Sequence, residues 1–431
     1  MNRIHFAKLL SDRGVGQKMY GAFSIVFVSV ALAAAGTFSL AELASVGGSS
    51  SSAAIGVNDK GDVVGWSYTA GFEQHSTLWA GGGAPGDLGT LAGGHLSNAA
   101  SLSSTGVIVG ASSRTDGSYH AALWSSASSA PVDLGTLGGT NSQAAGVNAS
   151  GDVVGFSYLT GDGTLHATIW PSGTPGPADL GTLLNGHFSQ AAAINTAGDV
   201  VGVSDDASWV SHATLWAAAG GHAAVSLQSL GGNYSQATGI NDKGDIVGMS
   251  ANAAGSFRAT LWPAPGHAPV DLGTLGGTFG GATGINAAGD VVGYSGTAGD
   301  LNRHATLWRA VGRVPFDLGV LPGGSSSQAT GVNASGQIVG FGVNSTFDTR
   351  AMFWKPALAT TPPPSGTGCV RSSGEHGERD RSKGERGEPD RKGQQGERSK
   401  GEKDNRSKGE QGNRNGQQGN HQNSGQEEGD C

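Results

Sequence analysis

The five residues HATLW occupy positions 304–308, and the same five letters occupy positions 212–216. Midway between them, residues 258–262 read RATLW. The tryptophan that ends this pentapeptide recurs in steps of 45 or 46 residues, at Trp79, Trp124, Trp170, Trp216, Trp262, Trp308 and Trp354. A fixed period of this length indicates that the chain is built from seven copies of one supersecondary unit.

Two further landmarks share this period. The glycine that ends VVG or IVG also occurs seven times, at Gly65, Gly110, Gly155, Gly202, Gly248, Gly293 and Gly340. A DLGTL-like segment follows each of the first six tryptophans, at 87–91, 133–137, 179–183, 226–230, 271–275 and 317–321. No such segment follows the seventh tryptophan, but ELASV at 42–46 stands before the first repeat. We therefore expect a closed ring in which this N-terminal segment completes the last repeat.

Each repeat has room for four short strands. In one copy, SQATGIN (235–241) ends in an Asn-x-x-Gly turn, DIVGMS (245–250) and RATLW (258–262) follow, and VDLGTL (270–275) closes the unit. Four strands in about 46 residues match one propeller blade. The predicted fold class is therefore all-β, a seven-bladed β-propeller of four-stranded blades. We expect the small residues of the first strand at the axis and DLGTL at the rim.

The composition supports this class. The 431 residues include 76 glycines and only 14% charged residues, and glycine weakens helix interiors. The net charge of −8 gives no reason to expect nucleic acid as a partner. Both cysteines, Cys369 and Cys431, lie outside the repeats, and they lack the spacing of a zinc site.

The N-terminus has the pattern of an export signal. Four basic residues and one acid precede an uncharged stretch at 21–41 whose apolar centre is 22–35. Small residues at Ser39 and Ala41 suit cleavage after Ala41. We therefore expect a signal peptide at 1–41 and a secreted or cell-surface protein, with the periplasm as an alternative compartment. An uncleaved membrane anchor is the other interpretation.

The C-terminus departs from the repeat. Residues 357–368 form a proline-rich linker, and residues 369–431 carry 13 basic and 13 acidic side chains with almost no apolar ones. Such a segment is expected to be a disordered spacer. Its glycines do not keep the three-residue period of collagen. The two cysteines could bridge within the tail or between chains.

These motifs resemble the HAF-type extracellular repeat family of bacteria. The resemblance rests on DLGTLGG, SQATGIN, GDVVG and HATLW and covers residues 42–356. The chain departs at the triplet that gives the family its name, where Thr168 stands in a position at which the family often has Phe. The resemblance implies an exported repeat protein and assigns no catalytic residue.

Residues that recur in every copy are expected to be structural. Equivalent positions in neighbouring blades are roughly 10 Å apart, whereas zinc ligands lie about 2 Å from the ion. The residue that opens HATLW should therefore make a repeated hydrogen bond instead of a metal site; it is His75, His120, His166, His212 or His304, with Arg258 and Arg350 in the other two copies. The Asn-x-x-Gly-Asp segments should be hairpin turns, although weak calcium binding remains open; no cofactor is expected. The seven tryptophans should form core.

Positions that break the repeat are the candidates for binding. The loops between blades differ from copy to copy, and variable loops on a rigid scaffold commonly carry function. The predicted ligand-binding residues are His95, Asn141, His187, Phe188, Asn233, Tyr234, Phe279 and Trp209. Nearby amides could instead bridge blades structurally; they are Asn98, Gln143, Gln190, Gln236 and Gln328.

The functional expectation is a binding, adhesion or interaction scaffold that acts through one face. Aromatic residues among amides and acids suit a carbohydrate ligand, and a protein ligand is the other option. A membrane partner is expected only if residues 1–41 are retained. The alternative is an extracellular polysaccharide hydrolase or lyase, but no catalytic motif is present and no pair of carboxylates stands out.

Overall fold

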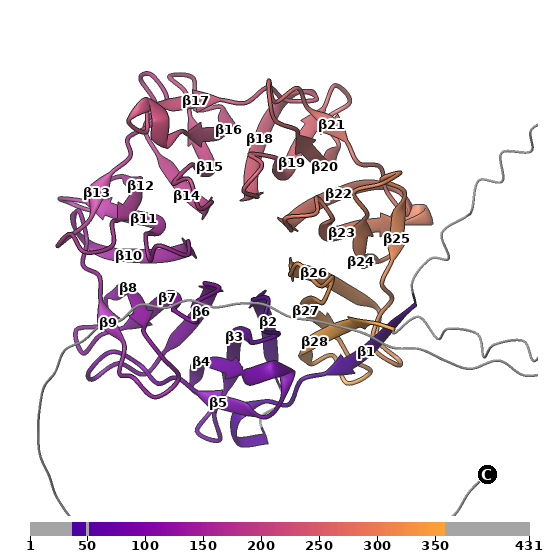
Figure 1. The fold of residues 1–431 in the computed structure, drawn as a ribbon, viewed down its shortest axis with the longest axis horizontal. Coiled ribbons are helices and arrows are strands. Elements are labelled where there is room, and N and C mark those ends of the chain that lie inside the picture. Colours follow the sequence, from indigo (N-terminus) through magenta and orange to yellow (C-terminus); the bar gives the residue numbers. More distant parts are fainter. Residues whose placement is uncertain (1–36, 49–50, 358–431) are drawn as a thin grey trace, which may run out of the picture. The chain divides into compact units, whose positions relative to one another are not determined.

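The computed structural model describes residues 37–48 and 51–357, which form seven four-stranded antiparallel sheets arranged as blades around a central axis (Figure 1). Blades 1 to 6 each use four strands that are consecutive in the chain. Blade 7 has the order β1 (Phe38–Glu42), β28 (Thr349–Pro356), β27 (Ile338–Val343) and β26 (Ser326–Val332), so its outer strand comes from the N-terminus. The predicted seven-bladed propeller, including its closure, is confirmed. Residues 358–431, which include the predicted linker except its first residue and the whole predicted tail with Cys369 and Cys431, lie outside the described residues.

The innermost strand of each blade is rich in Ala, Gly and Ser, which allows seven backbones to converge on the axis. These strands are β2 (Ser52–Val57), β6 (Ser97–Leu102), β10 (Gly138–Val147), β14 (Ser189–Ile194), β18 (Gly231–Ile240), β22 (Gly276–Ile285) and β26 (Ser326–Val332). Each inner strand has a register shift against its neighbour, as between Ala54 and Gly56. Next to that shift, a Cβ on Gly65 would collide with the backbone oxygen of Ala53. This close approach explains why VVG recurs in the sequence.

The second and third strands are covered on both faces by neighbouring blades. The second strands are β3 (Val63–Tyr68), β7 (Ile108–Ser113), β11 (Val153–Leu159), β15 (Val200–Asp205), β19 (Ile246–Asn252), β23 (Val291–Thr297) and β27 (Ile338–Val343). The third strands are β4 (Gln74–Trp79), β8 (Tyr119–Trp124), β12 (Leu165–Trp170), β16 (Ser211–Trp216), β20 (Phe257–Trp262), β24 (Arg303–Trp308) and β28 (Thr349–Pro356). Burial on both faces removes the alternation expected of a half-exposed strand.

The outer strands are shorter than predicted: each contains only the first residue of its DLGTL-like segment, together with the one or two residues before it. They are β5 (Pro85–Asp87), β9 (Val132–Asp133), β13 (Ala178–Asp179), β17 (Ala224–Ser226), β21 (Val270–Asp271) and β25 (Pro315–Asp317). The aspartate ends the strand because its carboxylate accepts the N–H of the glycine two residues on, as Asp271 does from Gly273 at 2.8 Å. The intervening leucine then turns inward, and Leu272 is buried.

The strand that closes the ring also begins before the segment that the sequence predicts. Strand β1 (Phe38–Glu42) pairs with β28 over all five of its residues, with Leu40 opposite Trp354. The closing strand therefore lies four residues before the predicted segment 42–46, and only Glu42 is common to both. The predicted signal peptide 1–41 overlaps this strand; its first 36 residues lie outside the described residues.

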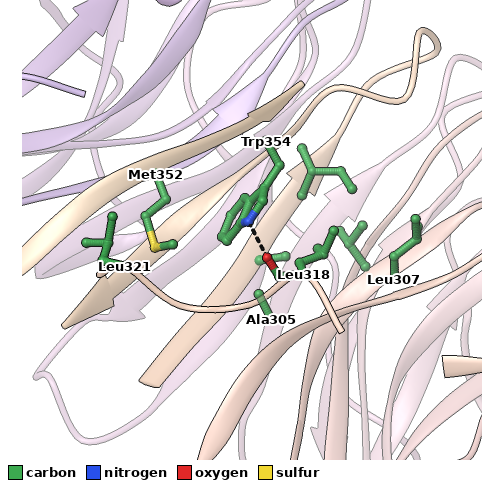
Figure 2. Close-up of a cluster of buried hydrophobic side chains, with 9 residues drawn as sticks. Ala305, Leu307, Leu318, Leu321, Met352 and Trp354 are labelled. Atoms are coloured by element: carbon green, nitrogen blue, oxygen red, sulfur yellow. Dashed lines mark hydrogen bonds between the residues drawn. The ribbon is translucent and has the colours of Figure 1, made fainter. Parts of the chain in front are cut away.

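The hydrophobic core lies between the blades. All seven repeated tryptophans are buried, as the sequence predicts. Figure 2 shows one such layer, in which the indole Nε1 of Trp354 donates to the backbone oxygen of Leu318 in the preceding blade at 2.8 Å, beside Met352 and Leu321. The pattern means that neighbouring blades bury their apolar side chains against each other.

The Asn-x-x-Gly turns, at the end of the propeller opposite the loops discussed below, are hairpins, as predicted. The Oδ1 of Asn241 accepts the backbone N–H groups of Lys243 and Asp245 within its own turn. Its Nδ2 donates to the backbone oxygen of Asn286 in the next blade at 3.2 Å. Equivalent bonds link five neighbouring pairs of blades, including the Nδ2 of Asn333 to the oxygen of Asn58 across the seam at 2.8 Å. These amides tie the ring together at its inner edge.

Four short 3-10 turns complete the described fold: η1 (Val46–Gly48), η2 (Ala80–Gly82), η3 (Ala218–Gly220) and η4 (Ala298–Asp300). Within 37–48 and 51–357, none of the helices has the length and apolar character needed to cross a bilayer.

Candidate binding face

One end of the propeller carries two sets of loops that differ between copies. Because the strands alternate in direction, the hairpins from second to third strand and the crossings between blades lie at the same end. We call this end the loop face. Its hairpins are residues 69–73, 114–118, 160–164, 206–210, 253–256, 298–302 and 344–348.

A polar clamp joins the third and outer strands near this face. The residue that opens HATLW binds the acid that ends the outer strand; the pairs are His75–Asp87 (2.8 Å), His120–Asp133 (2.7 Å), His166–Asp179 (2.8 Å), Arg258–Asp271 (2.9 Å), His304–Asp317 (2.9 Å) and Arg350–Glu42 (3.4 Å). Histidine and arginine are interchangeable here because both donate to a carboxylate. The predicted structural hydrogen bond is confirmed.

Blade 4 departs from this clamp. Its outer strand ends in Ser226, and His212 turns instead to Asp206 in the loop-face hairpin, with Nε2 and Oδ2 3.0 Å apart. Hydrogen bonds from His212 and from the backbone N–H groups of Ser208 and Val210 hold the pKa of Asp206 below its usual value. In blade 4 the histidine of the repeated HATLW motif therefore orders a loop-face hairpin instead of joining two strands.

The same hairpin carries Trp209, and the structure brings it together with two other predicted residues, His187 and Phe188. The imidazole of His187 stacks on the indole of Trp209, with ring centroids 3.7 Å apart and planes 3° from parallel. Beneath them, fully buried Asp205 accepts the backbone N–H groups of His187 and Phe188 at 2.7 and 2.8 Å. Its other oxygen lies 3.2 Å from Nδ1 of His187. His187 and Trp209 thus form an aromatic platform, and the hydrogen bonds of Asp205 fix the orientation of His187 in it.

Trp209 presents the outer surface of this platform to solvent, with 67% of the residue exposed. One ring face is covered by His187, so the opposite face is available for stacking. The sequence identified both aromatic residues but not their partner Asp205, because that contact joins an inter-blade loop to the end of β15.

The other predicted residues lie on the loop face in separate places. Exposed His95 pairs with Glu73 of blade 1 at 3.1 Å, and Oδ1 of Asn141 accepts the backbone N–H of Tyr119 at 2.8 Å. Asn233 is exposed, and Phe279 packs on Gly296. These contacts anchor loops to the adjoining hairpins, and they do not assemble one further site.

Tyr234 belongs to a cluster at blades 5 and 6. Its ring meets Phe257 edge-on at 5.4 Å, and its hydroxyl donates to Gln236 at 3.0 Å. Burial, followed by the proximity of Tyr294, raises the pKa of the Tyr234 phenol. Gln236 is thus one of the predicted amides whose side chain is engaged within its own blade.

Two aromatic residues that the sequence analysis did not select share the environment of Trp209. Phe72 and Phe347 occupy the same hairpin position, where the residue's N–H donates to the carbonyl three residues earlier. All three have left-handed backbones, with φ of 61°, 64° and 64° for Phe72, Trp209 and Phe347. Gly117 and Gly255 fill the equivalent position in two other blades, with φ of 83° and 81°.

An aromatic residue in this conformation is unfavourable by itself. The left-handed region costs a residue with a Cβ roughly 1–2 kcal/mol. Burial does not offset this cost, because Phe72 and Phe347 are 80% and 86% exposed. The stability of the fold therefore does not account for aromatic residues at positions where sister blades place glycine. A comparison of the seven hairpins in register would have revealed them in the sequence.

The charge of the loop face is negative. Its hairpins contain six carboxylates and one basic residue; they are Glu73, Asp116, Asp162, Asp206, Asp300, Asp348 and Arg114. Within the part of the chain that the structure describes, no group of three or more His, Cys, Asp or Glu side chains is placed to hold a metal ion.

The described residues also line several cavities. One of about 220 Å³ runs along the axis between the inner strands, and another of about 210 Å³ lies at the Asn-turn end, beside Asn58 and Asn333. A third, of about 230 Å³, lies between blades 1 and 2 and is lined by Tyr68, Gln74, Leu96, Ser97, Asn98 and Tyr119. None of the eight predicted residues lines these three cavities.

No family model matches the chain, and no curated protein matches it. Among solved structures, the chain is similar to a crystal structure of puromycin hydrolase, at 12% identity and a TM-score of 0.48 over 69% of this chain and 51% of that one. A puromycin-hydrolyzing peptidase of Mycobacterium tuberculosis gives 12% identity and 0.45, over 76% and 54%. The chain therefore spans about half the length of these two proteins.

The chain is also similar to the β-propeller domain of the Trilobed protease from Pyrococcus furiosus, at 8% identity and a TM-score of 0.46, over 72% of this chain and 98% of that one. The SapL1 lectin, solved with alpha methyl fucoside, gives 14% identity and 0.34, over 73% and 98%. At these identities and TM-scores the likenesses carry no information about function.

Proposed function

We propose that the chain is an exported propeller that binds carbohydrate through its loop face. The observation that carries this proposal is the platform of blade 4, where His187 stacks on exposed Trp209 and buried Asp205 fixes the stack. The N-terminal sequence pattern and the resemblance to HAF-type extracellular repeats support export.

The platform has the physical properties that a sugar ring requires. An indole offers a large flat apolar surface at a small cost in side-chain entropy, and it is already ordered before the ligand arrives. Polar residues are close to it in the chain: half-buried Asp206 belongs to the same hairpin as Trp209, and exposed Asn185 precedes His187 by two residues. A pyranose combines one apolar face with a rim of hydroxyl groups, and it therefore matches an aromatic plane bordered by hydrogen-bonding side chains.

The charge of the face argues against two other ligand classes. Nucleic acids and anionic membrane surfaces are both attracted by clusters of Lys and Arg. The loop-face hairpins instead have six carboxylates against one arginine. These carboxylates would repel an anionic ligand, whereas an uncharged ligand is not repelled.

The rival function, cleavage of a polysaccharide, needs two carboxyl groups that flank the scissile bond, about 5–5.5 Å or 6.5–9.5 Å apart. At the platform, Asp205 is buried and engaged with His187 and Phe188, and Asp206 is held by His212. Both carboxylates have structural roles, which favours binding over catalysis.

The test is binding of the purified propeller to an array of neutral glycans, for the wild type and for Trp209→Ala. We expect binding to weaken about tenfold or more while the melting temperature is kept, because Trp209 packs little against the core. The control is Val311→Ala, since Val311 is 92% exposed on the opposite end of the molecule. Unchanged binding in Trp209→Ala, or release of reducing sugar by the wild type, would contradict the proposal.

A further inference from the structure

The three exposed aromatic residues with left-handed backbones are not spread evenly around the ring. Phe72 belongs to blade 1 and Phe347 to blade 7, which are neighbours across the seam. Trp209 belongs to blade 4, which is three blades from each of them. In a ring of seven, three steps is the greatest separation. These three residues therefore form two aromatic patches at opposite sides of the loop face, the Phe72–Phe347 patch and the Trp209 platform, besides the Tyr234–Phe257 cluster described above.

The distance between the patches excludes a small ligand that touches both. Neighbouring sheets pack roughly 10 Å apart, so a ring of seven has a mean circumference of about 70 Å and a diameter of about 20 Å. One or two sugar units cannot cover that span. An extended chain of several units can lie across it.

We infer that the ligand is an extended, uncharged polysaccharide chain that crosses the loop face from the Phe72–Phe347 patch to the Trp209 platform. This inference rests on the proposed function and adds to it the length and the charge of the ligand. Two weak patches that engage one polymer act together, because contact at one raises the effective concentration at the other.

Glycine variants provide the test, because Gly117 and Gly255 show that the hairpin accepts glycine at this position. Phe72→Gly/Phe347→Gly removes one patch, and Trp209→Gly removes the other. Each variant also removes a strained backbone, so the melting temperature should stay the same or rise. A fall in melting temperature would show that these aromatic side chains stabilise the fold by packing, and it would overturn the inference.

The probes are soluble neutral β-glucan, mannan and galactan, together with oligosaccharides of graded length cut from whichever polymer binds. We expect either variant to lose about 100-fold in affinity for the polymer, and we expect wild-type affinity to rise steeply once the oligosaccharide is long enough to span both patches. If only Trp209→Gly weakens binding, the proposed function holds and the crossing polymer is wrong. If neither variant weakens binding, both are wrong.

A second, independent inference concerns processing of the N-terminus. Strand β1 starts at Phe38, and the backbone oxygen of Thr37 accepts the N–H of Ala357 at 2.7 Å. Phe38 also packs against Phe316, with ring centroids 6.0 Å apart. Cleavage after Ala41 would remove four of the five residues of β1 and leave the edge of β28 unpaired.

A cleavage point that spares β1 is present directly upstream. Ala33-Ala34-Ala35 supplies small residues at the positions three and one before a cut, and it forms the end of the apolar stretch of the export signal. We also infer that processing occurs between Ala35 and Gly36, which leaves the closing strand intact.

Expression of the full chain in a bacterium that exports it, followed by N-terminal sequencing, tests this inference. The mature protein should begin at Gly36; Ala35→Lys should block processing, whereas Ala41→Lys, at an exposed position of β1, should not. A mature chain that begins at Glu42, or one that keeps residues 1–35, would overturn it.

Discussion

At the scale of single residues, the seven buried tryptophans look equivalent in the sequence but differ in hydrogen bonding. The indole N–H groups of Trp79, Trp124, Trp262 and Trp354 donate to a backbone oxygen of the preceding blade. Those of Trp170, Trp216 and Trp308 are buried and have no hydrogen-bond partner. The same residue therefore contributes differently to stability in different blades.

Matched substitutions should expose this difference. Trp124→Phe removes a donor and leaves the buried oxygen of Leu88 without it, which costs about 1–3 kcal/mol beyond the loss of packing. Trp308→Phe loses the same packing but also removes an unsatisfied N–H group. Chemical denaturation should show the larger loss of unfolding free energy for Trp124→Phe. Equal losses would mean that the unpaired indoles are satisfied in solution.

The clamp between third and outer strands should make stability depend on pH. Burial raises the pKa of Asp179, but hydrogen bonds from His166 and Gly181 outweigh it and hold the pKa below its usual value. A lowered pKa means that the folded state favours the carboxylate, so the stabilisation is present above the ordinary Asp pKa and is lost as pH falls through the folded pKa.

Asp179→Asn should therefore lower the melting temperature at neutral pH by an amount that shrinks as the pH falls toward 2. The loss in unfolding free energy at neutral pH should be no more than about 1 kcal/mol, because the His166–Asp179 pair is partly exposed. Melts of both proteins from pH 7 to pH 2 measure it. A difference that stays constant across this range would show that the charge of Asp179 is irrelevant.

Residue roles set by the repeat were readable from the sequence, and roles set by contacts between distant segments were not. Repetition alone showed that the tryptophans are core and that His166 and its equivalents are structural. The support of His187 by Asp205 depends on how an inter-blade loop folds back on β15. The left-handed backbone of Phe72 depends on the length of its hairpin, which only alignment against the glycine-containing hairpins makes visible.

At the scale of elements, the number and order of strands followed from the repeat, but the bounds of the outer strand did not. DLGTL has strand-forming residues, yet only its aspartate pairs with the third strand. The turn that begins at this aspartate and the burial of the next leucine between blades override local strand propensity. For the same reason, the closing strand precedes ELASV instead of coinciding with it.

This shift yields a direct prediction about the N-terminus. A chain that starts at Glu42 should melt well below one that starts at Gly36, because it loses the β1–β28 ladder and the contacts of Phe38 and Leu40 with the last layer of core. Calorimetry of the two purified chains makes the comparison. Equal melting temperatures would show that residues 38–41 do not contribute to closure.

At the scale of the whole molecule, the repeated contacts and the variable hairpins lie in different parts of the ring. Equivalent layers of tryptophan, leucine and alanine repeat between blades, and the Asn-turn end repeats its hydrogen bonds from blade to blade. The loop face instead differs in almost every copy. Phe72→Gly should therefore leave the core undisturbed, because Phe72 is exposed on the loop face.

The seam in blade 7 also governs the order in which the molecule can form during synthesis. Blades 1 to 6 are built from hairpins of neighbouring residues, which can pair as soon as they leave the ribosome or the export channel. Strand β1 is made first, but its partner β28 is made only after every other blade. Bringing these two segments together has the largest loop-closure cost in the fold. The first residues of the propeller to be translated are thus the last to pair. Until β1 pairs with β28, the unpaired edge of β28 can bind a strand of another chain.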